Sequence, residues 1–421
     1  PFNVVESPEF RDFILFTGQG HLQDKDVPHR DKIVAVAEAM YYVEKNLIDS
    51  DMKAARGFIS LTSDLWSDPI LHAFMAVTAH YIDQNGLLKD HLIAFRKIDG
   101  VHSGANLADA MYKILRQSGI AYKVGYITLD NASNNNTMMR ELAGSLKAHG
   151  LVFDADLNRL QCFPHILNLA VQAITSALSE SAKRHRQKMR EAGLYVSSAE
   201  ERYLDALESD PLEAIRTSIH ACRASGTRRE DFSKMIEHGN NEGTFHLPDG
   251  TSIIIPNRQL LRDSPTRWGS TYIMSGRYIE VYPAIVELAY QCRKTAHIPF
   301  ITHAQYETVQ DLLTVLSIGY NAQELLSAEK TPTLSLVFPL FESIIQNWKQ
   351  LADTIPELRH AISCGIKKIY DYMGRANKVP AHTIAMFLNP MFKMDWFYSK
   401  WEHEDAERAV SIIKTEVSLG H

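Results

Sequence analysis

Phe58-Ile-Ser-Leu-Thr-Ser-Asp64-Leu-Trp66 is the stretch that decides the fold, because its apolar, strand-like run leads to a single aspartate. A second stretch, Ile127-Thr-Leu-Asp130-Asn-Ala-Ser-Asn134, has the same arrangement. Each aspartate stands at the end of an expected strand and before a polar turn, where a sheet can present a carboxylate to a metal ion. We therefore interpret the two stretches as a pair.

The sequence around these stretches predicts a layered α/β fold. Three apolar or alternating runs come first, and Asn85-Gly86 between the last two is typical of a hairpin turn. Ser103 can cap the helix that follows. The predicted strands are 57–65, 72–82, 87–98, 124–129 and 159–162, and the predicted helices are 104–117, 135–148 and 164–178. This order predicts an RNase H-like mixed five-stranded sheet with flanking helices.

The flanking regions differ in character from this core. Residues 1–55 read as a helical N-terminal lead-in, and the core is expected to span 56–178. The segment 179–211 is rich in charge with weak apolar periodicity, so we expect a flexible linker there. Residues 212–421 are expected to be mainly helical. The clearest helical repeats there cover 278–292, 303–326, 334–354 and 358–373.

Composition narrows the class of protein. With 421 residues and 45% hydrophobic content, the chain is expected to form two or three domains. The four cysteines form no CxxC pair, no leader-like segment precedes them, and no apolar run could span a bilayer, so we expect a reduced, soluble intracellular protein. The net charge is −6, but Lys183-Arg-His-Arg-Gln-Lys-Met-Arg190 forms a basic cluster. Two interpretations remain open, a phosphate-binding stripe or a solvated helix face.

Two carboxylates on adjacent strands suit a specific chemistry. Neighbouring strands lie about 4.8 Å apart, so Asp64 and Asp130 could share divalent ions. Oxygen ligands favour Mg²⁺ or Mn²⁺, and two such ions about 4 Å apart can activate a water or a 3′-hydroxyl and stabilise the leaving oxygen of a phosphodiester. The alternative is that both aspartates only accept hydrogen bonds from turn amides.

Six phrases in order carry a resemblance to a known family. They are Phe58 to Trp66, Thr128 to Asn135, Cys162-Phe-Pro-His165-Ile-Leu-Asn168, Arg223-Ala-Ser225 with Arg228, Arg229 and Phe232, Asp263-Ser-Pro-Thr266-Arg267-Trp268-Gly-Ser270-Thr-Tyr272, and Leu388-Asn-Pro390-Met-Phe392-Lys393. With these phrases the chain resembles the hAT superfamily of DNA transposases, the hobo and Activator type. The resemblance implies an RNase H-like core with a helical insertion domain and an Asp, Asp, Glu catalytic triad.

The resemblance also implies roles for particular residues. Asp64 and Asp130 would be the first two catalytic acids and the ligands of Mg²⁺ or Mn²⁺. Cys162 and His165 match a CxxH motif near the active site that is associated with handling the transposon end or the flipped base. Arg267 and Trp268 match the Arg-Trp motif of the insertion domain, whose aromatic ring is implicated in stabilising a flipped base. The partner would be DNA at transposon ends, and the location would be the nucleus.

Alternatives to these DNA-binding roles stay open. An indole can stack an extruded base and an arginine can hold a phosphate, but Trp268 could equally pack the insertion domain. Cys162 and His165 could be ordinary core residues. Zinc ligation by this pair is disfavoured, because a structural site has four ligands and no second CxxC or HxxxH pair is present.

Two family features are missing from the sequence. It contains no Ser-Glu-Arg phrase for the third acid, which in the family lies in a C-terminal dimerisation region, and no amino-terminal BED-type zinc finger. Glu141, Glu324 and Glu329 are the substitutes considered, and none lies in a matching phrase. The chain alone is therefore expected to be an inactive transposase fragment. The alternative is a non-catalytic nucleic-acid-binding or interaction protein derived from a transposase.

Overall fold

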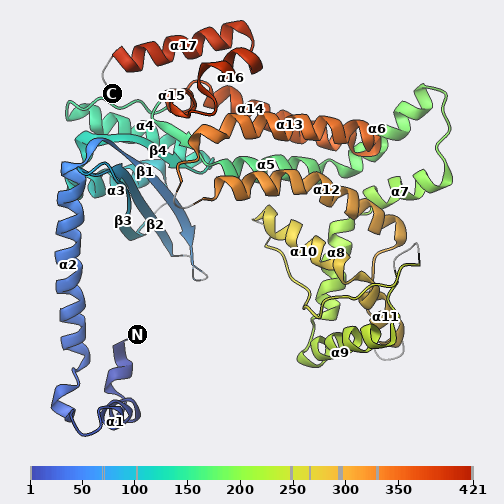
Figure 1. Cartoon of the computed structure of the whole chain (residues 1–421), viewed down its shortest axis with the longest axis horizontal. Coiled ribbons are helices and arrows are strands. Elements are labelled where there is room, and N and C mark those ends of the chain that lie inside the picture. Colours follow the sequence, from blue (N-terminus) through green and yellow to red (C-terminus); the bar gives the residue numbers. More distant parts are fainter. Residues whose placement is uncertain are drawn as a thin grey trace. The chain divides into compact units, whose positions relative to one another are not determined.

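The computed structural model describes residues 2–68, 70, 72–100, 103–246, 250–264, 267–292, 297–328 and 331–418. Internal contacts group the chain into two compact units, of which the first ends at Leu160 and the second begins at Gln161. The first unit contains all of the sheet except its final residue, and the second consists of helices (Figure 1). The sequence analysis expected the core to extend to residue 178. The internal contacts instead group the helix after the last strand with the second unit.

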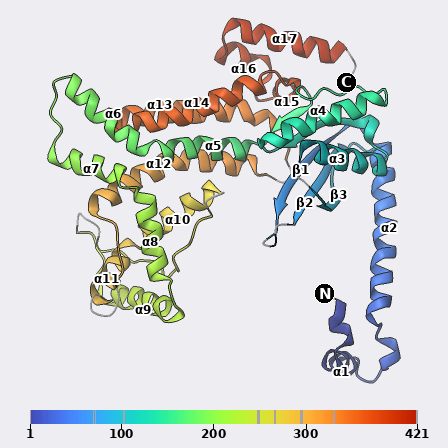
Figure 2. The same ribbon diagram turned by 180° about the vertical axis from the view of Figure 1, so that it is seen from behind.

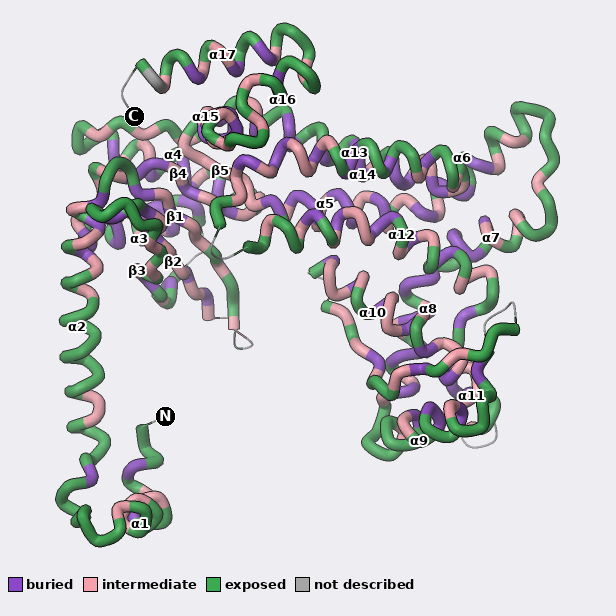
Figure 3. The backbone as a smooth tube through the Cα atoms, in the orientation of Figure 1, coloured by how far each residue is buried: buried purple, intermediate pink, exposed green. Residues whose placement is uncertain are grey.

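The predicted helical lead-in is present in the first unit. Helix α1 (Pro8–Thr17) is followed by the long helix α2 (Arg30–Ala54). The buried guanidinium of Arg11 orders the segment between them, since it donates to the Asp24 carboxylate at 2.6 Å and to the carbonyl of Val27 at 3.1 Å. Most of α2 is exposed (Figure 3).

The sheet contains five strands, β1 (Arg56–Ser67), β2 (Ala73–Ile82), β3 (Leu88–Ile98), β4 (Val124–Leu129) and β5 (Arg159–Gln161). Their order is β3-β2-β1-β4-β5, with β1 antiparallel to β2 and parallel to β4, so the predicted mixed sheet is confirmed. The hairpin between β2 and β3 turns at Gly86, whose φ of +83° favours glycine. Asp83 closes this turn by accepting hydrogen bonds from the amides of Asn85 and Leu87.

Two helices complete the core of the first unit, α3 (Gly104–Ser118) and α4 (Ser133–Ala148). Alternate residues of the sheet share one buried cluster with them, because successive strand residues point to opposite faces. The cluster includes Ile59, Leu61, Met75, Val77, Leu107, Met111, Met138 and Leu142. The other face of the sheet carries the partly exposed rings of Trp66, Phe74 and Phe95, with centroids 5.4–6.0 Å apart.

The second unit contains a helical bundle and a smaller subcluster. In the bundle, α5 (Phe163–Ser176), α12 (His303–Leu326), α13 (Val337–Thr354) and α14 (Arg359–Ala376) run side by side in both views (Figure 1 and Figure 2). Trp348 lies fully buried among them and donates its indole N–H to the carbonyl of Val315 at 2.9 Å. The subcluster contains α8 (Pro211–Cys222), α9 (Gly226–Glu242), α10 (Trp268–Glu280) and α11 (Tyr282–Cys292). The C-terminal helices are α15 (Pro380–Leu388), α16 (Lys393–Lys400) and α17 (His403–Ser418).

The flexible linker predicted at 179–211 is wrong, because this segment is helical. Helices α6 (Leu178–Glu191) and α7 (Ser198–Glu208) cover most of it, and both contribute side chains to the bundle core. A capping box starts α7: the Ser197 hydroxyl accepts from the amide of Glu200, and the Glu200 carboxylate accepts from the amide of Ser197. The apolar faces of α6 and α7 are narrow and their ion pairs are numerous. The sequence of 179–211 therefore resembled that of a disordered segment.

None of the helices in the described ranges combines the length and the apolar character that a membrane crossing needs.

Candidate functional site

The two predicted catalytic acids come from neighbouring parallel strands: Asp64 lies in β1, and Asp130 directly follows the end of β4. The β1–β4 ladder pairs Leu61 with Ile127 and Thr62 with Thr128. The last of these pairs is two residues short of the aspartates, and the same offset carried past the end of β4 would set Asp64 opposite Asp130. At the strand separation of about 4.8 Å, two carboxylates so placed could share one cation.

Asp64 itself lies inside a strand rather than at its end, where the sequence placed it. Strand β1 continues to Ser67, and Asp64 pairs with Ala76 of β2 on that side. On the other side the β4 ladder stops at Thr128, because β4 ends at Leu129. The carboxylate of Asp64 is exposed and uses Oδ1 to accept from the amide of Leu65 at 3.0 Å.

Asp130 is held more firmly, at the turn between β4 and α4. Its Oδ1 accepts from the amide of Ala132 at 3.0 Å and from the side chain of Asn135 at 2.6 Å. Its backbone carbonyl accepts from Arg159 at 3.0 Å. Asp130 also lines a hollow of about 200 Å³ together with Trp66, Asn134 and Asn135. These contacts orient the carboxylate next to the hollow.

The alternative for the two aspartates was that they only accept hydrogen bonds from turn amides. Part of it is observed, since each aspartate accepts a hydrogen bond from a nearby amide. Each uses only Oδ1 in this way, and within the described residues Oδ2 of Asp64 and of Asp130 accepts none. One oxygen of each carboxylate thus remains available to a cation.

Three asparagines around Asp130 were given no role from the sequence. Both polar atoms of Asn131, and Oδ1 of Asn134 and of Asn135, are buried without a hydrogen-bond partner among the residues described here. Buried polar groups are normally satisfied, so these atoms are available to ordered water or to a bound ion. The run of Asn after Asp130 was the available signal.

The structure describes two of the three substitutes considered for a third acid. Glu141 is exposed on α4, Glu324 is exposed on α12 in the other unit, and Glu329 lies outside the described residues. Over the described part of the chain, no group of three metal-ligating side chains includes Asp64 or Asp130.

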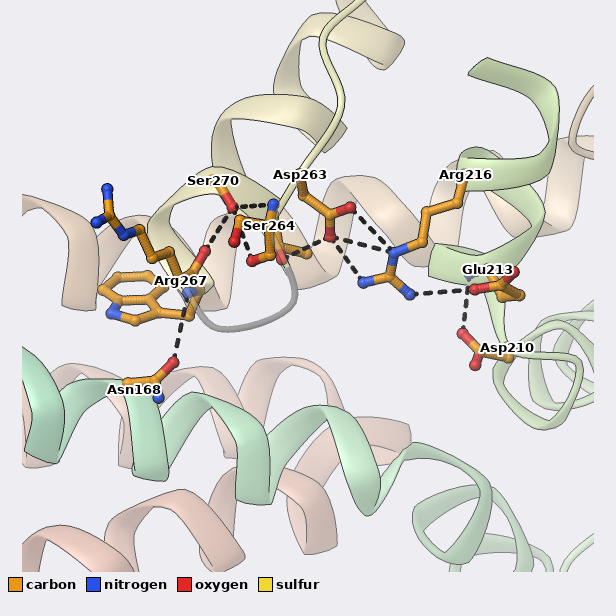
Figure 4. Close-up of polar contacts among 10 residues, drawn as sticks. Asn168, Asp210, Glu213, Arg216, Asp263, Ser264, Arg267 and Ser270 are labelled. Atoms are coloured by element: carbon orange, nitrogen blue, oxygen red, sulfur yellow. Dashed lines mark hydrogen bonds and ion pairs between the residues drawn. The ribbon is translucent and has the colours of Figure 1, made fainter. Parts of the chain in front are cut away.

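The other predicted site residues belong to the second unit, where an ion pair organises the segment before α10. Asp263 accepts from Arg216 of α8 at 2.8 Å and from the hydroxyl of Thr271 at 2.9 Å (Figure 4). Burial tends to raise the pKa of Asp263, but the hydrogen bonds from Arg216 and Thr271 outweigh it and hold this pKa below its ordinary value. The Arg216–Asp263 pair thus fixes the start of α10 against α8.

Trp268 is buried in this unit, with 5% of its surface exposed. Its indole N–H donates to Gln323 at 3.1 Å, its ring meets Tyr320 edge-on, and its backbone amide donates to Asn168 of α5 at 3.4 Å. Two of the six phrases therefore meet at Asn168 and Trp268. The contacts favour the packing role that the sequence left open, and base stacking stays a prediction that requires the ring to become uncovered.

Arg267, the neighbour of Trp268, has the opposite environment. Its side chain is exposed, and Figure 4 shows its guanidinium turned away from the Arg216–Asp263 pair. It makes no ion pair with any residue in the described ranges. Such a cation is available to a phosphate.

Cys162 and His165 lie at the start of α5. Cys162 is the N-cap residue of the helix and His165 is in its first turn, and both are partly buried. Within the described residues, neither belongs to a group of three metal-ligating side chains. Their predicted DNA-binding role is not tested by these contacts.

The basic cluster on α6 is partly neutralised within the unit. Arg186 pairs with Glu201 at 2.9 Å and with Asp205 at 2.7 Å, both on α7, and Arg184 pairs with Glu180 at 2.8 Å. The exposed cations left over are Lys183, Lys188 and Arg190. The stripe available to phosphates is therefore smaller than the sequence suggested.

Comparisons with known proteins agree with this architecture. Residues 62–156 match the family model described as the ZBED1 RNase-like domain, and residues 160–315 match the ZBED1 RNase-like helical domain. The boundary between these matches lies close to the division after Leu160 seen in the structure.

Similar curated proteins cover nearly the whole chain. A putative transcriptional regulator, tpeD, of Talaromyces stipitatus is 24% identical over 96% of this chain and 44% of its own length. The putative AC transposase of Zea mays is 24% identical over 96% of this chain and 45% of its own length. The BED-type zinc finger protein RICESLEEPER 3 of Oryza sativa subsp. japonica is 22% identical over 98% of this chain and 49% of its own length. The chain spans less than half the length of each of these relatives. Together with the RNase H-like sheet and the helical unit that follows it, these matches place the chain in the family of hAT-type transposase-like proteins.

Proposed function

We propose that the chain supplies the first two carboxylates of a divalent-metal site used for DNA phosphodiester cleavage and strand transfer. The observation that supports this proposal is the β1–β4 register, which would set Asp64 opposite Asp130 if it continued two residues past Thr128. The putative AC transposase among the similar proteins points to the same chemistry.

The residues around this pair fit Mg²⁺ or Mn²⁺. Both cations prefer oxygen ligands and retain several waters, so two carboxylates and a polar hollow suit them. Asp64 and Asp130 would hold the metal through the oxygens left without a partner. The unsatisfied amides of Asn131 and Asn134 would bond to its waters or to a phosphate oxygen.

The chain's own residues have defined tasks in this proposal. A bound divalent ion polarises a phosphodiester and lowers the pKa of a water or a 3′-hydroxyl. Asn135 keeps the Asp130 carboxylate in place, and the exposed guanidinium of Arg267 contacts DNA phosphate in the second unit. Cys162, His165 and Trp268 are assigned to DNA handling on the family resemblance. If the source is eukaryotic, a chromosomal DNA partner would place the protein in the nucleus.

With only two acids the chain would bind metal but not cleave DNA by itself. Over the described residues no third metal-ligating side chain accompanies Asp64 and Asp130. Loss of one essential group from a cooperative site removes most of the rate. We therefore expect Mn²⁺ binding without measurable strand cleavage.

Titration calorimetry with Mn²⁺ tests the proposed site. The variants Asp64→Asn and Asp130→Asn are expected to weaken Mn²⁺ binding at least about tenfold, because each removes a negative oxygen ligand without changing shape. Asp109→Asn is the matched control, since Asp109 is an exposed α3 residue paired only with Lys113. Unchanged Mn²⁺ binding in both site variants would refute the metal proposal.

A second candidate function is non-catalytic binding of nucleic acid. It is favoured by the exposed Lys183, Lys188 and Arg190 on α6, and one similar protein is described as a putative transcriptional regulator. Duplex binding that weakens with salt, and that persists in Asp64→Asn, would favour this function over cleavage.

A further inference from the structure

Three side chains able to ligate a metal meet in the helical unit, apart from every residue assigned above. They are His185 of α6, Glu200 of α7 and Glu357 of the short 3-10 turn η5 (Pro356–Leu358). One ligand atom from each lies within 4.8 Å of the other two, and His185 Nε2 is 2.8 Å from a carboxylate oxygen of Glu200. The side chain of His185 is 8% exposed and that of Glu200 is 21% exposed.

Contacts other than those among the three side chains hold His185, Glu200 and Glu357 close to one another. His185 falls on the buried face of α6 with Leu178 and Ala182, while the capping box holds Glu200 at the start of α7. Ser181 anchors η5 to α6, because its hydroxyl donates to the carbonyl of Glu357 at 2.6 Å and accepts from the amide of Ala361 at 3.3 Å. The cluster is therefore preorganised by backbone contacts.

The charge in this cluster is unbalanced. An imidazolium at His185 would offset one carboxylate, but Glu357 has no ion-pair partner among the residues that the structure describes. The nearby Arg186 is already engaged by Glu201 and Asp205. Since unpaired carboxylates are costly where water is partly excluded, a divalent cation would balance the pair where an imidazolium cannot.

The surroundings add further negative charge. Tyr203 of α7 donates to Asp311 at 2.7 Å. The pKa of Tyr203 is raised, first by burial and then by the negative charges of Asp311, Glu357 and Glu307. Among these charges, Glu357 belongs to the cluster itself, and a cation there would be stabilised by it.

We propose that His185, Glu200 and Glu357 bind one Zn²⁺ ion that joins α6, α7 and η5. One imidazole and two carboxylates are suitable zinc ligands, and a water would complete a tetrahedral set. With metal–ligand distances of about 2.0–2.2 Å, tetrahedral ligand atoms lie about 3.3–3.6 Å apart, so small side-chain rotations suffice. Mg²⁺ and Ca²⁺ prefer oxygen ligands alone, and the imidazole therefore selects against them. The proposal is independent of the metal proposed at Asp64 and Asp130.

Zinc titration of the chelator-treated full chain tests this site. The Asp64→Asn, Asp130→Asn double variant serves as the background, so that binding at those acids does not contribute. We expect one Zn²⁺ per chain, a higher melting temperature with Zn²⁺, and visible absorption from Co²⁺ substituted at the site. His185→Asn and Glu357→Gln should each weaken Zn²⁺ binding by at least about 10- to 100-fold. Loss of a residue that only hydrogen-bonds to a metal ligand already has an effect of this size.

The controls separate ligation from folding. Glu208→Gln should leave Zn²⁺ affinity unchanged, because Glu208 pairs with Arg186 and lies outside the cluster. Glu357→Gln keeps the side-chain shape and removes the unpaired charge, so its metal-free melting temperature should equal or exceed that of the background while the zinc-dependent rise disappears. An equal zinc-dependent rise in Glu357→Gln, no Zn²⁺ binding by the background, or displacement of Zn²⁺ by equimolar Mg²⁺ would each overturn the proposal.

Discussion

Replacing Gly104 with alanine is expected to destabilise the first unit by about 1–3 kcal/mol, the usual cost of overpacking. A Cβ at Gly104 would lie 2.4 Å from the Cβ of Thr137, 2.7 Å from the carbonyl oxygen of Asn134 and 2.7 Å from the amide nitrogen of Met138. Two of these contacts are with backbone atoms, which cannot rotate away. Helix α3 must therefore move away from α4, and urea unfolding measures the loss.

The same substitution should reach the candidate metal site. Asn134 lies in the first turn of α4, next to Asn135, which holds the Asp130 carboxylate. Displacement of this turn is expected to weaken Mn²⁺ binding severalfold even where the variant is fully folded. Calorimetry at a low temperature, with folding verified by circular dichroism, separates this effect from unfolding.

Gly144 provides the matched control on α4. A Cβ there meets no atom within 4 Å, and the residue is exposed. Gly144→Ala should stabilise the unit by about 0.5–1 kcal/mol, because alanine has less conformational entropy to lose on folding. Equal stabilities for the two alanine variants would contradict the close approach of α3 and α4 at Gly104.

The sheet and several helices could be predicted because their signals are local. The predicted helix 303–326 has the observed bounds of α12, since Thr302 and Gln305 form a capping box at its start. The segment 179–211 was missed because its two helices are stabilised by contacts with each other and with a partner far away in sequence. His185 and Arg186 contact residues of α7, and Ser181 contacts Glu357, which lies far away in sequence.

The candidate site was predictable only where strand order determined it. Asp64 and Asp130 have the same offset as the paired residues of β1 and β4, and that strand order can be inferred from the chain, so their proximity stays a prediction that the register supports. The burial of Trp268 could not be inferred, because Tyr320 and Gln323, which cover its ring, lie on α12. The unsatisfied asparagines depend likewise on how the turn after β4 packs.

Lowering the pH from 7 to about 4.5 is expected to cost the helical unit about 2 kcal/mol through one residue, His382 of α15. Burial lowers the pKa of His382 to about 4, and its Nδ1 has no hydrogen-bond partner in the described ranges. The unfolded chain, with an ordinary pKa of about 6.5, binds a proton that the folded chain does not, so stability falls as the pH drops from about 6.5 towards 4. Each unit of pKa difference corresponds to about 1.4 kcal/mol.

Urea unfolding at pH 7 and pH 4.5 gives the loss of unfolding free energy between these pH values for the wild type and for His382→Gln. The contribution of His382 is the loss in the wild type minus the loss in the variant. Other buried acids act with the opposite sign, since burial raises the pKa of Asp311 and of Glu342, and their contributions cancel in the comparison. His382→Gln should remove the acid-dependent loss, because glutamine does not titrate. His303→Gln is the control: the side chain of His303 is 72% exposed, so the pH dependence should stay that of the wild type. If His382→Gln loses as much stability as the wild type between these pH values, then His382 is protonated in the folded chain and the burial argument fails.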